Sequence, residues 1–339
     1  MDHLLVLSDD VGIIQHALED VPDRKTGYCT DDAARAFMVA VAHMRVVADR
    51  AVEPLARSNL AFLQHAQLDD GRFHNFMGYD RRWLDEVGTH DSCGRAIWAL
   101  GYGAAFAPAP SWRSVCARLL DRAMPSIGWL GYVRSRAYAM LGLSYAHASG
   151  QTRYGPVLQT LADDLLAAFR ANASADWPWF EDVMTYDNAR LPEALIRAGR
   201  QLGESRYLDA GLEALDFYAR VTTENGVYVP IGNDGWYRRG GRRARYDQQP
   251  LEACAMVDAQ LAAREATGDA AHSAAAELAL AWYYGKNSRG VVMARGGGCC
   301  DGLSEDSVNP NMGAESTLAL HAAALAMADR RPRILRAVR

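Results

Sequence analysis

Aspartates followed by arginines recur at three places in this 339-residue sequence. The pattern Thr-x-Asp, with an arginine about one turn later, occurs in Thr30-Asp31-Asp32…Arg35, Thr89-His90-Asp91…Arg95 and Thr185-Tyr186-Asp187-Asn188…Arg190. An aspartate can cap a helix N-terminus and pair with an arginine one turn on, so helix capping explains any one of them alone. The repetition favours a second interpretation, in which these groups face a common site.

Two further segments are polar in a different way. They are Asp247-Gln248-Gln249…Glu252 and Asn311…Glu315, and each precedes a long apolar segment. If all these segments meet at one end of the fold, carboxylates, amides and guanidinium groups line one bowl. Such a lining suits a ligand with many hydroxyl groups, which paired polar groups can hold.

Aromatic residues lie in the loops that precede these segments. Trp177 and Trp179 come directly before Glu181 and Asp182, and Trp236 lies in the loop before Asp247. Aromatic faces can stack on the apolar faces of sugar rings, although a tryptophan in a helical protein is often part of the core. The sequence therefore predicts a saccharide site with these members: Asp31, Arg35, His90, Arg95, Trp177, Trp179, Tyr186, Asp187, Asn188, Arg190, Trp236, Asp247, Gln248, Gln249, Glu252, Asn311 and Glu315.

Carboxyl groups with different expected pKa values indicate acid–base chemistry at this site. Glycoside cleavage needs one protonated and one ionised carboxyl group. Glu181, with Asp182 as its substitute, follows aromatic residues that should raise its pKa, so it is the predicted acid. Asp91 or Asp32 should be held ionised by the helix terminus and an arginine, and is the predicted base. The expected outcome is inversion.

Histidines supply an alternative chemistry. Proton transfer at a sugar carbon, as in an isomerase, epimerase or lyase, would need two histidines or a tyrosine facing the sugar ring. His90 stands in the second pattern, and His74 and His321 could approach it; His321, inside an apolar helix, has the simpler interpretation of a core residue.

Long helical patterns position these residues. Segments near 31–48, 90–106, 133–148, 187–202, 248–266 and 313–328 are apolar on most faces, which is typical of buried helices. Amphipathic segments near 53–67, 112–123, 153–171, 205–221 and 270–285 alternate with them, and a short C-terminal piece is the expected sixth. This alternation predicts an all-α (α/α)6 barrel, a six-hairpin toroid formed as one domain by residues 1–339, with the inner-helix N-termini forming the pocket. An open helical solenoid is the alternative.

Composition excludes several classes of protein. The net charge of −5 and the absence of a basic face argue against nucleic acid as a partner. No stretch is apolar enough to span a membrane, and the start of the chain lacks the features of a signal peptide. Six cysteines without framework spacing suggest reduced thiols in the cytoplasm, although the chain could be part of a longer polypeptide. No metal-ligand spacing and no cofactor fingerprint is present, so neither a metal nor a cofactor is expected.

Several motifs resemble a known family. The segments GYCTDDAARA, WPWFEDVMTYDNARLPEALI, DQQPLEA and GAEST resemble bacterial six-hairpin toroid proteins that occur alone or fused to glycosyltransferases. The resemblance implies this fold, a sugar ligand and a fused or associated glycosyltransferase. The architecture that it implies is similar to that of six-hairpin glycosidases and sugar epimerases. Three functions follow as hypotheses: a glycoside hydrolase, a sugar isomerase, epimerase or lyase, and a non-catalytic glycan-binding partner of a glycosyltransferase.

Overall fold

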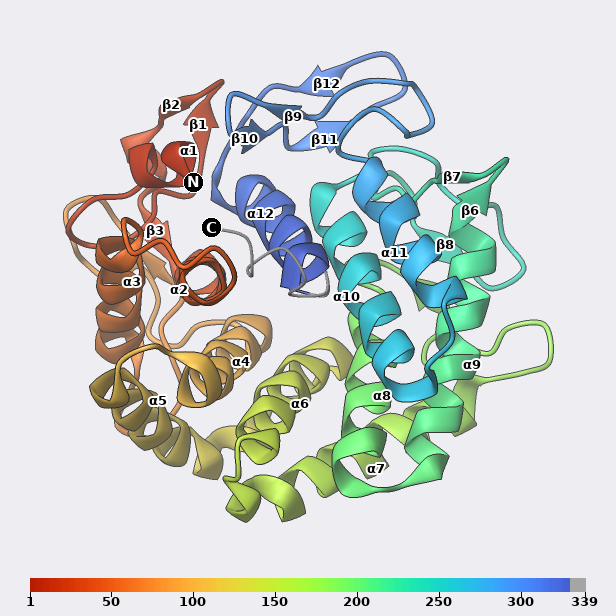
Figure 1. The fold of residues 1–339 in the computed structure, drawn as a ribbon, viewed down its shortest axis with the longest axis horizontal. Helices are drawn as coiled ribbons and strands as arrows, with labels where there is room; N and C mark the ends of the chain where they lie inside the picture. Colours follow the sequence, from red (N-terminus) through yellow and green to blue (C-terminus); the bar gives the residue numbers. More distant parts are fainter. Residues whose placement is uncertain (330–339) are drawn as a thin grey trace, which may run out of the picture.

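A computed structural model describes residues 1–329 and shows a closed ring of helices around a central axis (Figure 1). The inner helices are α2 (Thr30–Val46), α4 (His90–Phe106), α6 (Val133–Ala148), α8 (Arg190–Leu202), α10 (Pro250–Thr267) and α12 (Ala314–Asp329). The outer helices are α3 (Glu53–Ala66), α5 (Pro110–Ala123), α7 (Gly155–Asn172), α9 (Ser205–Thr222) and α11 (Ala271–Ala281). A short helix, α1 (Asp2–Val6), lies against α12.

The sequence patterns explain why each helix takes its layer. Inner helix α4 is buried from Ser92 to Ala104 because it packs against its inner neighbours and the outer layer. Its closest neighbour is α6, and Gly101 and Gly142 face each other at the contact, where a Cβ atom would collide with backbone of the other helix. Outer helices such as α9 bury one face only.

The ring closes because α12 packs against α2, so each inner helix has two inner neighbours. The predicted all-α (α/α)6 barrel is confirmed, and the alternative of an open solenoid is wrong. The expected C-terminal outer helix falls on residues 330–339, which lie outside the described part of the chain. Short 3-10 turns occur within the connections: η1 (Arg24–Thr26), η2 (Met124–Trp129) and η3 (Thr152–Tyr154).

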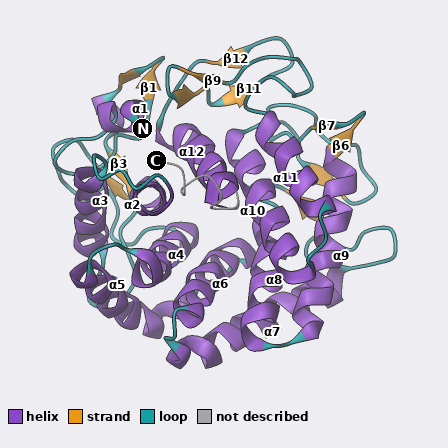
Figure 2. Cartoon of the chain, viewed as in Figure 1, coloured by secondary structure: helices purple, strands orange, loops and turns teal. Residues whose placement is uncertain are grey.

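Within residues 1–329, six short antiparallel strand pairs connect the loops between the helices (Figure 2). They are β1 (Ala17–Leu18) with β2 (Val21–Pro22), β3 (Tyr28–Cys29) with β4 (Phe76–Met77), β5 (Val183–Met184) with β8 (Tyr237–Arg238), β6 (Thr223–Glu224) with β7 (Val227–Tyr228), β9 (Ala294–Arg295) with β10 (Gly298–Cys299), and β11 (Gly302–Leu303) with β12 (Val308–Asn309). Two pairs matter for function: β3–β4 joins the loops before α2 and α4, and β5–β8 joins those before α8 and α10. These loops therefore support one another at the inner-helix N-termini.

The six cysteines are all buried and unpaired. No helix within residues 1–329 is long and apolar enough to cross a membrane. Over the same residues, no group of three or more potential ligand side chains is arranged to hold a metal ion.

Candidate active site at the N-terminal ends of the inner helices

An open cavity of about 430 Å³ lies where the inner helices begin. We call it the mouth cavity, and its lining comes from four inner-helix starts and the loops beside them: Asp31, Arg35, Asn75, Phe76, Thr89, Asp91, Arg95, Tyr186, Asn233, Trp236, Gln249, Leu251 and Glu315. The three patterns found in the sequence are thus brought together at one end of the barrel. Of the predicted saccharide-site members, seven line this cavity together with the predicted base Asp91, and the others lie beneath it or away from it.

Arg95 links the first and third patterns across the barrel. Its Nε lies 3.1 Å from Asp31 Oδ1, its Nη1 donates a hydrogen bond to Asp187 Oδ2 at 3.1 Å, and its Nη2 donates to Tyr138 Oη at 2.7 Å. Arg95 is 6 % exposed, so this is a buried bridge between helices rather than an i,i+4 pair within one helix. The sequence pattern correctly predicted that Arg95 pairs with an aspartate of the site, but the partners are Asp31 and Asp187 rather than Asp91.

Asp31 faces the mouth cavity from the first turn of α2. Burial raises the pKa of its carboxyl group above the ordinary value; Arg95 and Arg35 act against this, while Asp91 and Glu315 add to it. Its Oδ1 accepts no hydrogen bond from any described residue, although it lies next to Arg95. Asp31 is therefore a carboxyl group in the cavity whose protonated form is favoured by its surroundings.

Asp32 lies behind the cavity wall, contrary to its predicted role. It is 5 % exposed and its Oδ1 accepts a hydrogen bond from Arg35 Nη1 at 2.9 Å. Burial raises its pKa to about 6 in spite of Arg35, because desolvation outweighs the ion pair and Glu315 adds to the shift. The helix terminus and Arg35 therefore do not offset the effect of burial, although a pKa of about 6 still leaves Asp32 mostly ionised near neutral pH. Arg35 also donates to Glu315 Oε2 at 2.7 Å, which joins α2 to α12.

The aspartates do not cap these helices. Cys29 Sγ accepts from Asp32 N at the start of α2, and Thr89 Oγ1 accepts from Ser92 N at the start of α4. Asp187 precedes α8 and has a φ of 49°. Its carboxylate forms ion pairs with Arg95 and Arg190 and accepts a hydrogen bond from the Tyr138 hydroxyl. Burial would raise the pKa of Asp187, but Arg95 and Arg190 together lower it. Helix capping therefore does not account for the repeated aspartates.

Asp91 is held from across the cavity by Tyr186. The Tyr186 hydroxyl donates to Asp91 Oδ2 at 2.6 Å, while burial and the negative charge of Asp91 raise the pKa of Tyr186. The phenol thus stays protonated and remains a donor at any physiological pH. The Arg134 guanidinium lies 4.9 Å from the centre of the Tyr186 ring, and Arg134 Nε donates to the Tyr186 carbonyl at 2.6 Å, so the ring has a fixed orientation.

The predicted acid lies away from the mouth cavity. Glu181 is not among its lining residues, and its Oε2 accepts a hydrogen bond from Arg134 Nη1 at 2.6 Å. Trp177 and Trp179 are 2 % and 0 % exposed and belong to the core, where Trp179 stacks with Tyr218. Asp182 points to solvent with a side chain that is 73 % exposed. The argument for Glu181 fails because a guanidinium, rather than indole rings, contacts its carboxylate.

Six other predicted members stabilise the loops and helices around the cavity. Glu252 is buried beneath the third pattern, where it accepts hydrogen bonds from the backbone of Asp187 and from Tyr218 Oη. Gln248 accepts from Trp282 Nε1, Asp247 accepts from Ser304 Oγ, and Asn311 accepts from the backbone of Ala17. Asn188 and Arg190 are likewise buried and bonded, to Arg134 and Asp258 respectively. These side chains fix the loops that carry the cavity lining.

The structure adds lining residues that sequence reasoning missed. They are Asn75, Phe76, Thr89, Asn233 and Leu251. Phe76 is the first residue of β4 and Asn75 directly precedes it, outside the repeated patterns, so the β3–β4 pairing brings both to the start of α2. Asn75 Oδ1 is buried and lacks a partner among the described residues. Trp236, the remaining predicted aromatic, lines the cavity and lies 6.4 Å from the Tyr186 ring, centre to centre.

No histidine among residues 1–329 lines the mouth cavity. His90 stacks on Trp129 at the rim, His74 Nδ1 lies 3.2 Å from Asp85 Oδ1, and His321 Nε2 lies 2.9 Å from the Gly297 carbonyl. Burial lowers the pKa of His321 to about 4, and its half-buried ring contacts the Gly297 carbonyl rather than the mouth cavity. The pair of histidines considered for proton transfer at carbon is therefore not assembled at this site.

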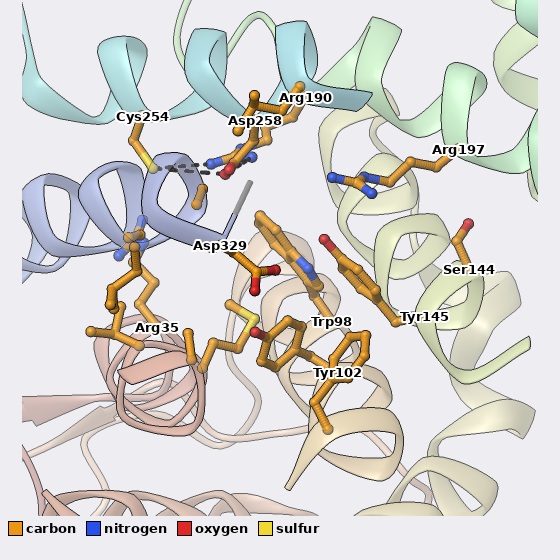
Figure 3. A pocket seen from close by; sticks show the side chains of 18 of the residues that line it. Arg35, Trp98, Tyr102, Ser144, Tyr145, Arg190, Arg197, Cys254, Asp258 and Asp329 are labelled. Atoms are coloured by element: carbon orange, nitrogen blue, oxygen red, sulfur yellow. Dashed lines mark hydrogen bonds and ion pairs between the residues drawn. The ribbon is translucent and has the colours of Figure 1, made fainter. Parts of the chain in front are cut away.

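A second cavity, of about 530 Å³, lies below the mouth at the C-terminal ends of the inner helices (Figure 3). Arg35, Arg95 and Leu251 line both cavities and so separate them. Guanidinium groups cover its aromatic rings: Arg190 lies 4.7 Å from the centre of the Trp98 ring and Arg197 5.0 Å from that of Tyr145. Arg190 and Arg197 are both paired with the buried Glu193. The mouth cavity, where Asp31, Asp91 and Glu315 lie together, is the better candidate for acid–base chemistry.

Comparison with solved structures shows the fold to be that of known (α/α)6 enzymes. A cellobiose 2-epimerase from Bacillus thermoamylovorans has a TM-score of 0.75 at 11 % identity, covering 97 % of this chain and 95 % of that one. A D-mannose isomerase has a TM-score of 0.71 at 15 % identity, covering 97 % and 94 %. An α-1,6-mannanase of Salegentibacter sp., solved with α-1,6-mannotetrose, has a TM-score of 0.65 at 12 % identity, covering 96 % of each chain.

The sequence itself gives no closer relation. No protein-family model matches it, and no curated protein matches it significantly. At identities this low the structural likeness establishes the fold alone, and the predicted link to a glycosyltransferase stays a prediction.

Proposed function

We propose that this protein is a glycoside hydrolase that uses carboxyl groups of the mouth cavity on an oligo- or polysaccharide. The observation that carries the proposal is that Asp31, Asp91 and Glu315 line one open cavity together with two arginines and a tyrosine. Solved proteins of the same fold include a mannanase, an epimerase and an isomerase, all acting on sugars, which supports a saccharide ligand.

Asp31 is the proposed general acid. Burial raises the pKa of its carboxyl group, which is the direction that a general acid needs in order to donate a proton to the leaving oxygen. A further observation supports a role for adjacent aspartates in this fold. The mannanase solved with its ligand is an inactive variant in which two adjacent aspartates are replaced by alanine. In this chain, Asp31 and Asp32 are the adjacent aspartate pair that begins an inner helix.

Asp91 is the proposed general base. Its carboxylate is oriented by the Tyr186 hydroxyl, and it lies at the start of α4, the helix next to that of Asp31. The cavity of about 430 Å³ has room for a water molecule beside a sugar ring, so we expect direct attack by water and inversion at the anomeric carbon. Arg95 and Arg35 fix Asp31 and Glu315 and remain near enough to bind sugar hydroxyls.

Epimerisation or isomerisation of a sugar is the second candidate, because the epimerase and the isomerase have higher TM-scores than the mannanase. The lack of cavity histidines within residues 1–329 argues against it, and Tyr186 would have to serve as a proton-transfer group. A non-catalytic glycan-binding role is the third, and predicts saccharide binding without turnover.

Proton NMR in D2O, over a panel of mannan-, glucan- and xylan-derived oligosaccharides with and without phosphate, distinguishes these functions. Hydrolysis gives two shorter sugars, phosphorolysis requires phosphate, and epimerisation incorporates deuterium at carbon without cleavage. Asp31→Asn should lower the rate by about a hundredfold or more on natural glycosides and far less on aryl glycosides with an activated leaving group. Asp91→Asn should impair both. A wild-type protein that cleaves no glycoside, or an Asp31→Asn variant with full activity on natural glycosides, would refute the proposal.

A further inference from the structure

Three aromatic side chains form a cluster on the rim of the mouth, outside the cavity. The rings of His90 and Trp129 stack with their centres 3.9 Å apart and their planes 17° apart. Tyr132 meets His90 edge-on, with centres 4.9 Å apart and planes at 84°. We call His90, Trp129 and Tyr132 the rim cluster; none of them lines the mouth cavity.

The rim cluster is rigid at its base. The Gly131 N–H donates to His90 Nδ1 at 3.1 Å, which joins the start of α4 to the loop before α6. The Tyr132 carbonyl accepts hydrogen bonds from Ser135 Oγ at 2.7 Å and from the Arg136 N–H at 3.1 Å. The loop backbone that carries the Tyr132 ring is therefore fixed.

Tyr132 presents an open ring surface. It is 63 % exposed, and the perpendicular contact with His90 can cover at most one of its two ring faces. Exposed apolar side chains that cluster at the edge of a cavity are typical of binding surfaces, whereas single exposed ones are not. The fold gains little from this ring, because packing in the core does not involve it.

The rim cluster continues the mouth cavity. His90 and Asp91 are consecutive in the first turn of α4, and Asp91 lines the cavity while His90 belongs to the cluster. Within the cavity, Phe76 is also 42 % exposed, so aromatic surface is available on both sides of this boundary. The cavity volume is near the lower end of the range for ligand sites, so a longer glycan must extend over the rim.

We propose that the rim cluster is an outer subsite, in which the face of Tyr132 stacks on a sugar ring of the same glycan whose neighbouring unit lies in the mouth cavity. The inference rests on the proposed function and specifies its substrate class as an oligosaccharide or polysaccharide rather than a free monosaccharide. Stacking suits this place because a pyranose ring has an apolar C–H face and needs no charged partner there.

Isothermal titration calorimetry with saccharides of different length tests the subsite. The probes are mannose, α-1,6-mannotetraose, cellobiose and cellotetraose, followed by the oligosaccharide of the NMR panel that gives the strongest signal. Tyr132→Ala should weaken tetrasaccharide binding by about five- to tenfold and leave binding of the shorter sugar of the same series unchanged. Tyr132→Phe, which keeps the ring face, should retain wild-type affinity. Phe76→Ala should weaken short and long sugars alike.

Tyr284→Ala provides the matched control, because Tyr284 is 54 % exposed and lines neither cavity. It should bind every sugar as the wild type does. Tetrasaccharide affinity that Tyr132→Ala leaves intact, or a loss that is equal for short and long sugars, would overturn the outer subsite while the proposed hydrolase stands. No binding of any saccharide by the wild-type protein would instead overturn the proposed function, and the subsite with it.

Discussion

Replacing Arg95 by methionine should strongly destabilise the barrel, because Arg95 is the bridge between two of its inner helices. The substitution keeps the apolar part of the side chain and removes the guanidinium from Asp31, Asp187 and Tyr138. Asp187 is 2 % exposed and its carboxylate cannot turn to water. Breaking a buried ion pair by removing one partner costs about 3–5 kcal/mol. We therefore expect the free energy of unfolding to fall by that amount.

A double-mutant cycle separates the ion pair from general damage. Asp187→Asn in the Arg95→Met background removes the unpaired charge, so the double variant should be more stable than the sum of the two single changes predicts, by about 1–3 kcal/mol. Urea unfolding, followed by circular dichroism and tryptophan fluorescence, measures each variant where the two transitions coincide. Arg82→Met is the control: this arginine is 84 % exposed and its removal should cost less than about 1 kcal/mol.

The reasoning fails if Arg95→Met costs less than about 1 kcal/mol, or if the two changes add without coupling. Either result would mean that water reaches Asp187 or that Arg190 alone satisfies it. The thermodynamic contribution of the bridge would then be that of a surface pair.

Other consequences can be measured directly. Burial and the charge of Asp187 raise the pKa of Glu252 to about 7, so between about pH 4.5 and 7 the folded state holds a proton that the unfolded state releases. The free energy of unfolding of the wild type should therefore fall by up to about 3 kcal/mol, relative to that of Glu252→Gln, as pH rises from about 4.5 through 7. A titration in which both proteins show the same pH dependence would contradict this. Glu181→Gln should keep near-wild-type activity, since Glu181 lies outside the cavity; a hundredfold loss with the fold intact would restore it as the acid. Trp179→Ala should cost about 3–5 kcal/mol of stability because the ring is in the core, whereas Trp236→Ala should weaken saccharide binding and leave the unfolding midpoint unchanged. The six buried cysteines should react with a thiol reagent only after unfolding, and labelling in the native state as fast as in urea would show that the barrel opens.

Much of this protein was readable from its sequence because the relevant signals are local. Apolar and amphipathic segments alternate along the chain, and helix periodicity together with hydrophobic burial requires the first kind to lie inside the second. The starts of α4 and α10 fell within two residues of the sequence expectation. The convergence of the polar patterns also followed, because hairpins that alternate in direction place every inner-helix N-terminus at the same end.

Individual side-chain roles depended on contacts between segments far apart in the sequence. Arg95 could be paired with Asp91 one turn away, yet it contacts Asp31 on α2 and Asp187 in the loop before α8. Trp177 and Trp179 could face solvent or core, and only the packing of α9 and the β5–β8 loops shows that they are buried. Asn75 and Phe76 reach the mouth through a strand pair that no local pattern encodes. The sequence alone thus determined the helices and the end of the barrel that carries the site, because periodicity and helix direction are local properties. Which carboxyl groups face the cavity was decided by tertiary structure, because burial and ion pairing depend on the whole ring of helices.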